Sequence, residues 1–162
     1  MSDLNERICI IGGGPAGLAA AISAYDNGVK DVLIFEREET LNALGLNGTL
    51  CTRNATTVLK DSKVLPLYNK YFDIDALIFT DIKSRFVTLR NRKTGKQVKV
   101  DFPNCDYFLL WHKPNSPYMC LEPWDGIQDL ADSSFDITEK EGIIALEKGK
   151  VYNHTHSINI LS

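Results

Sequence analysis

The chain has 162 residues, of which 44% are hydrophobic and 24% are charged. This composition is typical of a soluble globular protein with enough chain for one well-filled core. The formal net charge is −3, so neither a nucleic acid nor an anionic membrane is expected as a partner, because both require concentrated positive charge.

The four cysteines are Cys9, Cys51, Cys105 and Cys120. None of them forms a C-x-x-C pair and no histidine stands at ligand spacing from two of them, so no metal site is expected. Cys9 and Cys120 lie in apolar runs, which predicts buried thiols. Because the sequence shows no signal peptide, we expect a reducing, cytoplasmic location.

The first 38 residues have the pattern of a strand, a glycine-rich turn, a helix and a second strand. A β-branched run at residues 7–11 leads directly into the sequence GGGPAG at residues 12–17. Residues 18–25 are rich in alanine and predict a helix, and residues 32–35 predict a strand that ends at Glu36. Together these features predict a short Rossmann-like βαβ unit.

This unit resembles the N-terminal dinucleotide-binding unit of flavoprotein oxidoreductases, which binds the ADP half of FAD. In such a unit Gly12 permits the tight turn, Gly14 admits the pyrophosphate and Gly17 lets the helix pack closely on the strand. Glu36 lies about 20 residues further on, where an acid accepts hydrogen bonds from the ribose. The resemblance implies FAD or NAD(P) as a cofactor, although one βαβ unit supplies only one wall of such a site.

Beyond residue 39 the pattern changes to β-type alternation with turn residues. Asn47-Gly48 predicts a turn and Thr94-Gly95 predicts the tip of a hairpin. Residues 135–146 predict irregular structure with one short helical turn. The predicted strands cover residues 75–80, 84–90, 97–102, 107–111, 118–122 and 150–161. Short antiparallel strands at this spacing predict a mainly β fold, an antiparallel sandwich or part of one.

Several segments in this region resemble the C-terminal half of the aldose 1-epimerase, or galactose mutarotase-like, family, and most closely its bacterial LacX-type branch. The resemblance extends over about residues 32–162. The segments are FEREETL at 35–41, LPL at 65–67, FDIDALIF at 72–79, KSR at 83–85, CLEPWDGIQD at 120–129 and EKEGIIALEKGK at 139–150. The resemblance implies a partial antiparallel β-sandwich, a hexose as ligand and no cofactor.

The two resemblances overlap at residues 32–38, and two interpretations remain open. In the first, a Rossmann-like fragment at residues 1–38 is joined to a mutarotase-like fragment at residues 39–162, with the junction near 32–38. In the second, the chain is a natural single domain in which the glycine-rich motif is incidental.

Mutarotases interconvert sugar anomers by deprotonating the anomeric hydroxyl, protonating the ring oxygen, and opening and reclosing the ring. The resemblance implies that Glu122 is the general base, partly desolvated by Trp124. It also implies that Asp75 holds a sugar hydroxyl and that Trp124 contributes to sugar binding. Without the resemblance, Glu122 would be an exposed acid at a strand end and Asp75 an acid at a strand start.

Trp111, His112 and Lys113 are further candidates for sugar binding, because the corresponding strand of the family runs beside the site. The alternative for His112 is a partly exposed histidine at a strand end. The family's general acid is a histidine in an HPAF-type segment, which this sequence lacks. His154 and His156 are expected to be structural or solvated. We therefore expect a truncated protein with weak or absent epimerase activity, and unpaired strand edges that favour self-association.

Overall fold

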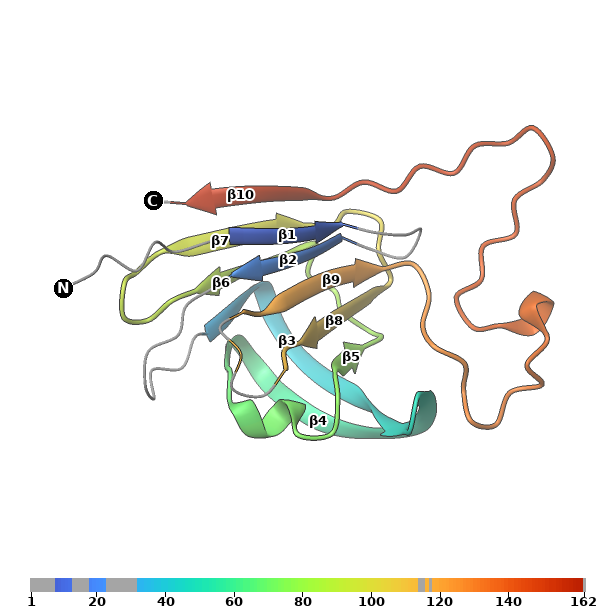
Figure 1. The fold of residues 1–162 in the computed structure, drawn as a ribbon, viewed down its shortest axis with the longest axis horizontal. Helices are drawn as coiled ribbons and strands as arrows, with labels where there is room; N and C mark the ends of the chain where they lie inside the picture. The colour runs from blue at the N-terminus through green and yellow to red at the C-terminus, as the bar shows by residue number, and fades with distance from the viewer. Residues whose placement is uncertain (1–7, 13–17, 23–31, 114–115, 117, 162) are drawn as a thin grey trace.

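The computed structural model describes residues 8–12, 18–22, 32–113, 116 and 118–161. These residues form strands connected by loops and two short 3-10 helices, in agreement with the predicted mainly β fold (Figure 1). The elements are β1 Ile8–Gly12, β2 Leu18–Ile22, β3 Val32–Asn47, β4 Leu50–Pro66, η1 Asn69–Phe72, β5 Leu77–Phe79, β6 Phe86–Arg90, β7 Gln97–Asp101, β8 Tyr107–Trp111, β9 Cys120–Trp124, η2 Ile137–Glu139 and β10 Ser157–Leu161.

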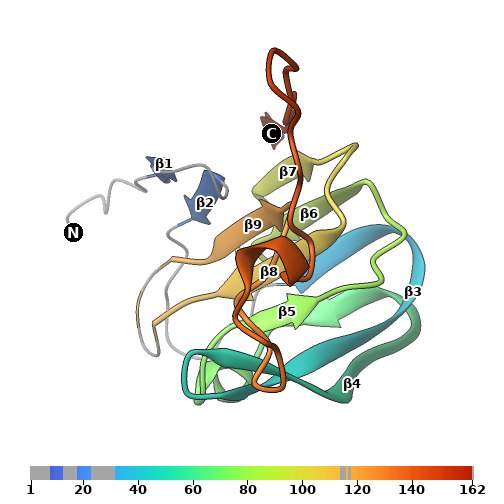
Figure 2. The same cartoon turned by 90° about the vertical axis from the view of Figure 1, so that its right-hand side faces the viewer.

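The strands join into one curled antiparallel sheet whose order is β1-β2-β9-β8-β5-β3-β6-β7-β10, with β4 paired to β3. β3 connects the two groups of strands. Its first residues, Val32 to Phe35, pair with β6, whereas Ala43 pairs with Phe79 of β5. Register shifts between β3 and β4 allow the long strand β3 to bend. Figure 2 shows the strands arranged around an interior instead of in a flat layer.

The turn predicted at Asn47-Gly48 is confirmed, because β3 ends at Asn47 and Gly48 has a φ of 62° that favours glycine. The long strand that follows, β4, was not predicted. Its residues 53–57 are exposed, so they lack the apolar alternation that indicates a half-buried strand. Pairing with β3 makes this segment a strand.

Most other strands lie close to their predicted positions. Tyr107–Trp111 is strand β8, which is buried on both faces. β9 is shifted by two residues from the prediction, so that Glu122 lies at its centre and not at its end. Only Ser157–Leu161 of the predicted last strand pairs with the sheet. The helical turn predicted within residues 135–146 is η2.

The predicted helix after the glycine-rich motif is wrong in its described part. Leu18–Ile22 is strand β2, which pairs with β1 and places Ala20 and Ala21 opposite Leu121 and Cys120 of β9. This pairing gives partners to backbone N–H and C=O groups at the edge of β9, in place of the intrahelical hydrogen bonds that the alanine-rich sequence favours. The second predicted strand also differs, because β3 continues past Glu36 to Asn47.

The two faces of the sheet pack against different apolar clusters. A central core lies on the inner face and includes Phe35, Phe79, Phe108 and Leu121, none more than 1% exposed. A second cluster lies on the opposite face of β5 and β8. It contains Cys51, Ile78, Tyr107, Leu109, Ile127 and Leu130, with Trp111 and Trp124 packed against it. Within the described part of the chain, no helix is long and apolar enough to span a membrane.

Candidate functional site

Glu122 lies on the face of the sheet that carries the second cluster. Side chains alternate along a strand, so Cys120, Glu122 and Trp124 share this face. Across the strand pair, Glu122 is opposite Leu109, which is 3% exposed. A carboxylate is therefore placed in the middle of an apolar surface.

The surroundings of Glu122 change its acidity. Burial raises the pKa of the Glu122 carboxyl, whereas hydrogen bonds from Trp124 and Cys120 act in the opposite direction. The indole Nε1 of Trp124 donates to Glu122 Oε2 over 3.0 Å. Burial, together with the charge of Glu122, raises the pKa of the Cys120 thiol to about 12. Cys120 is thus a protonated donor to the carboxylate at neutral pH.

Aromatic side chains flank this carboxylate. Trp111 is opposite Cys120 in the register of β8 and β9, which makes it a diagonal neighbour of Glu122. The Trp111 ring is 6.0 Å from the Tyr118 ring, measured between centroids, with an interplanar angle of 51°. Both tryptophans predicted to bind sugar therefore lie on the same face as the predicted base.

Asp75 is exposed and comes two residues before β5. Its Oδ1 accepts a hydrogen bond from the backbone N–H of Ala76 over 2.9 Å. Because Leu77 pairs with Leu110 of β8, Asp75 lies at the end of the sheet where Trp111 is found. The structure thus places Asp75 at the periphery of the surface around Glu122.

His112 points away from that surface. It is only 4% exposed, and its ring makes an edge contact with Phe72 of the central core at a centroid distance of 4.5 Å. Its Nδ1 donates to the backbone oxygen of Lys113 over 2.8 Å. The expectation of a partly exposed histidine is therefore wrong, and the structure does not bring His112 to the same face as Glu122. The neighbouring Lys113 is exposed.

The contact between Asp125 and His154 was not predicted from the sequence. His154 Nδ1 lies 2.6 Å from Asp125 Oδ2, and His154 Nε2 lies 3.1 Å from Nδ1 of His156. No local pattern could reveal this pair, because 29 residues separate the two side chains. His154 is half-buried in a polar cluster and is not simply solvated.

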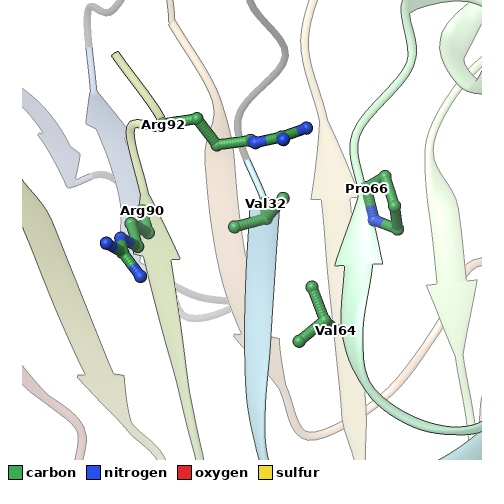
Figure 3. Close-up of a pocket in the computed structure, with 5 residues that line it drawn as sticks. All are labelled: Val32, Val64, Pro66, Arg90 and Arg92. Carbon is green, nitrogen blue, oxygen red and sulfur yellow. The ribbon is translucent and has the colours of Figure 1, made fainter. Parts of the chain in front are cut away.

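A cavity of about 440 Å³ lies elsewhere on the sheet, where β3, β4 and β6 meet. Figure 3 shows the Arg92 side chain extending across the start of β3 toward the side that carries Pro66. None of the predicted site residues lines the cavity. Its lining residues are Val32, Val64, Pro66, Arg90 and Arg92.

The described part of the N-terminal region does not fit a dinucleotide site. Gly12 ends strand β1, and a strand follows at Leu18 where the βαβ unit requires a helix. The Glu36 carboxylate accepts a hydrogen bond from the backbone N–H of Arg85 over 2.7 Å, and this bond lowers its pKa. Gly14 and Gly17 lie outside the described residues.

Two curated relatives, the plasmid-encoded and chromosomal LacX proteins of Lactococcus lactis subsp. lactis, are each 33% identical to the chain over 116 residues. These relatives and the two solved structures described next support a resemblance to the aldose 1-epimerase-like family. The matched part makes up 71% of this chain and 39% of each relative, so the chain spans well under half the length of these curated relatives.

Two solved structures have the same fold as this chain. A galactose mutarotase related enzyme from Lactobacillus acidophilus has a TM-score of 0.77 and 24% identity, over 90% of this chain and 51% of that one. A galactose mutarotase-like protein from Lactobacillus casei has a TM-score of 0.69 and 21% identity, over 88% and 50%. A family model described as an FAD binding domain matches residues 7–68, which include the glycine-rich motif.

Proposed function

We propose that this chain binds a hexose on the surface around Glu122 and is related to enzymes that interconvert sugar anomers. The observation that carries the proposal is the partial burial of Glu122 beside Trp124 and Leu109, in a chain whose fold resembles that of a galactose mutarotase related enzyme. A desolvated carboxylate with a raised pKa is suited to exchange a proton near neutral pH.

In the proposed reaction, the Glu122 carboxylate removes the proton from the anomeric hydroxyl. A proton from solvent water moves to the ring oxygen as the bond between C1 and the ring oxygen breaks. After rotation about the C1–C2 bond the ring closes on the other face, the ring-oxygen proton returns to water and Glu122 returns its proton to the anomeric oxygen. The Trp124 N–H holds the carboxylate in place through its 3.0 Å hydrogen bond. In this proposal Trp111 and Trp124 offer apolar faces to the sugar, and Asp75 and Lys113 bind its hydroxyl groups.

The second proton-transfer group determines how fast such a reaction runs. Among the described residues, the hydrogen bonds of Glu122 come from Trp124 and Cys120. The histidines make their contacts elsewhere, His112 with Phe72 and His154 with Asp125. Loss of a general acid typically costs on the order of 10² to 10⁴ in rate. We therefore expect hexose binding with little or no mutarotation.

Polarimetry with galactose and glucose measures the activity, and isothermal titration calorimetry measures binding. We expect the wild-type protein to bind one of these hexoses and Glu122→Gln to bind it more weakly. Glu147→Gln, which changes an exposed acid, is the matched control and should bind like the wild type. Absence of heat on titration with both sugars, together with mutarotation no faster than in buffer, would exclude the proposal.

A second candidate function is that of a fragment of an FAD- or NAD(P)-dependent oxidoreductase. It is favoured by the family-model match over residues 7–68 and by the glycine-rich motif. Flavin absorbance of the purified protein, and a rise in melting temperature with FAD, NAD or NADP, would support it. A colourless protein whose melting temperature none of these cofactors changes rules it out.

A further inference from the structure

Three potential metal ligands from separate parts of the chain meet beside the central core. Cys105 lies in the connection between β7 and β8, Asp125 follows β9, and His154 precedes β10. One donor atom from each of these side chains lies within 4.8 Å of the other two. Because the three residues are distant in sequence, the tertiary fold creates this cluster.

The three donor atoms lie near enough to one another to bind one zinc ion after small movements of the side chains. Cys105 Sγ lies 4.0 Å from His154 Nδ1, which lies 2.6 Å from Asp125 Oδ2. Zinc bonds of about 2.3 Å to sulfur and about 2.0–2.1 Å to nitrogen or oxygen imply separations of about 3.6 Å and 3.3 Å between such ligands. Small side-chain rotations that move the imidazole toward the thiol and away from the carboxylate achieve both separations.

The neighbouring His156 orients the imidazole of His154. Its Nδ1 lies 3.1 Å from His154 Nε2, so a proton on Nε2 of His154 can be donated to it. In the absence of metal, the 2.6 Å separation from Asp125 Oδ2 requires a proton on His154 Nδ1, and a bound metal ion would take the place of that proton. Metal-binding histidines in proteins commonly donate their second N–H to an acceptor in the same way.

The burial of the three side chains also suits a bound ion. Cys105 is fully buried, whereas the side chains of Asp125 and His154 are 20% and 24% exposed. An ion can therefore approach from the solvent side and reach a thiol on the core side. A ligand set of thiolate, imidazole and carboxylate matches zinc, and does not match Mg²⁺ or Ca²⁺, which prefer oxygen ligands alone.

We propose that Cys105, Asp125 and His154 bind a single zinc ion. The ion links the segment before β10 to the sheet. Such a link would hold this segment against the sheet. Among the described residues between β9 and β10, the only helix is the short η2, so little regular structure does so otherwise. The spacing of cysteines and histidines along the sequence gives no indication of this site, since each ligand comes from a different connection.

The test uses the full chain after removal of metal by dialysis against a chelator. We expect it to bind one equivalent of Zn²⁺ in competition with a chromophoric chelator. With Co²⁺, we expect a near-ultraviolet charge-transfer band that requires a thiolate ligand. Loss of an outer-shell partner alone costs about 10- to 100-fold in metal affinity. Cys105→Ser and His154→Ala should therefore each weaken Zn²⁺ binding by more than about 100-fold, and Cys105→Ser should also abolish the cobalt band.

Cys51→Ser is the matched control, because Cys51 is equally buried but its Sγ lies 3.4 Å from Gln128 Oε1, away from the cluster. This variant should keep the zinc affinity and the cobalt band. Asp125→Asn is a conservative third variant, with folding of every variant checked by circular dichroism. Absence of Zn²⁺ binding in the folded wild type, or equal losses in Cys51→Ser and Cys105→Ser, would show that Asp125 and His154 form an ion pair and not a metal site.

Discussion

Glu39 is a buried carboxylate that joins strand β3 to the connection between β5 and β6. It is 3% exposed, and its Oε1 accepts hydrogen bonds from Ser84 N at 2.6 Å, Ser84 Oγ at 2.7 Å and Lys83 N at 3.2 Å. Glu39→Ala leaves both buried donors of Ser84 without an acceptor. An unsatisfied buried donor costs about 1–3 kcal/mol, so the predicted loss in the free energy of unfolding is about 2–6 kcal/mol.

Urea denaturation followed by tryptophan fluorescence measures this loss. Glu38→Ala is the control, because Glu38 is the exposed neighbour and surface substitutions usually change stability by less than about 0.5 kcal/mol. Ser84→Ala removes only one of the donors, so it should cost less than Glu39→Ala. The two losses should also be non-additive in the double variant, because the side chains share hydrogen bonds. If Glu39→Ala and Glu38→Ala have equal unfolding free energies, the hydrogen bonds of Glu39 do not stabilise the fold.

Three further predictions concern the base, the core and the N-terminal region. Because the pKa of Glu122 is raised in the folded state, the folded protein binds a proton more tightly there than the unfolded chain does. The wild type should therefore gain stability relative to Glu122→Gln as the pH falls from above the folded pKa towards the unfolded pKa. A difference in urea midpoint between the two proteins that stays constant from pH 4 to 8 would contradict this. Phe108→Ala, at a fully buried ring stacked 4.9 Å from Phe102, should cost about 3–5 kcal/mol in thermal or urea unfolding, and a loss below about 1 kcal/mol would argue against this packing. If residues 1–38 are a joined fragment, limited proteolysis should cut first before Val32, leaving a resistant product that retains β3; uniform resistance of residues 23–31 would favour the single-domain interpretation.

The structure explains why two of the family segments occur together. The segment FEREETL at 35–41 contributes Glu36 and Glu39. The segment KSR at 83–85 contributes backbone N–H groups that donate hydrogen bonds to both carboxylates. In addition, the backbone N–H of Arg37 donates to Ser84 Oγ over 3.3 Å. These residues are separated by more than 40 positions, so the sequence shows the two segments but not the bonds between them. Glu36, predicted to contact a ribose, is instead part of this network in the structure.

The sequence alone determined the features that depend on neighbouring residues. Apolar and aromatic residues from Tyr107 to Trp111 predict strand β8, and the glycines at positions 48 and 95 predict two turns that the structure contains. The family resemblance identified Glu122, together with Trp111 and Trp124, as candidate site residues. Their shared face follows from strand alternation once the register of β8 and β9 is known.

Only the tertiary structure decided the features that depend on distant partners. Leu18–Ile22 is a strand because β9 offers it an edge, despite a sequence that favours a helix. Glu122 has a raised pKa because the packed sheet buries it, and this burial outweighs its hydrogen bonds from Trp124 and Cys120. His154 meets Asp125 and Cys105 because the chain returns from β9 to β10. Propensity acts between neighbours in sequence, whereas backbone pairing, burial and electrostatic contacts act between neighbours in space.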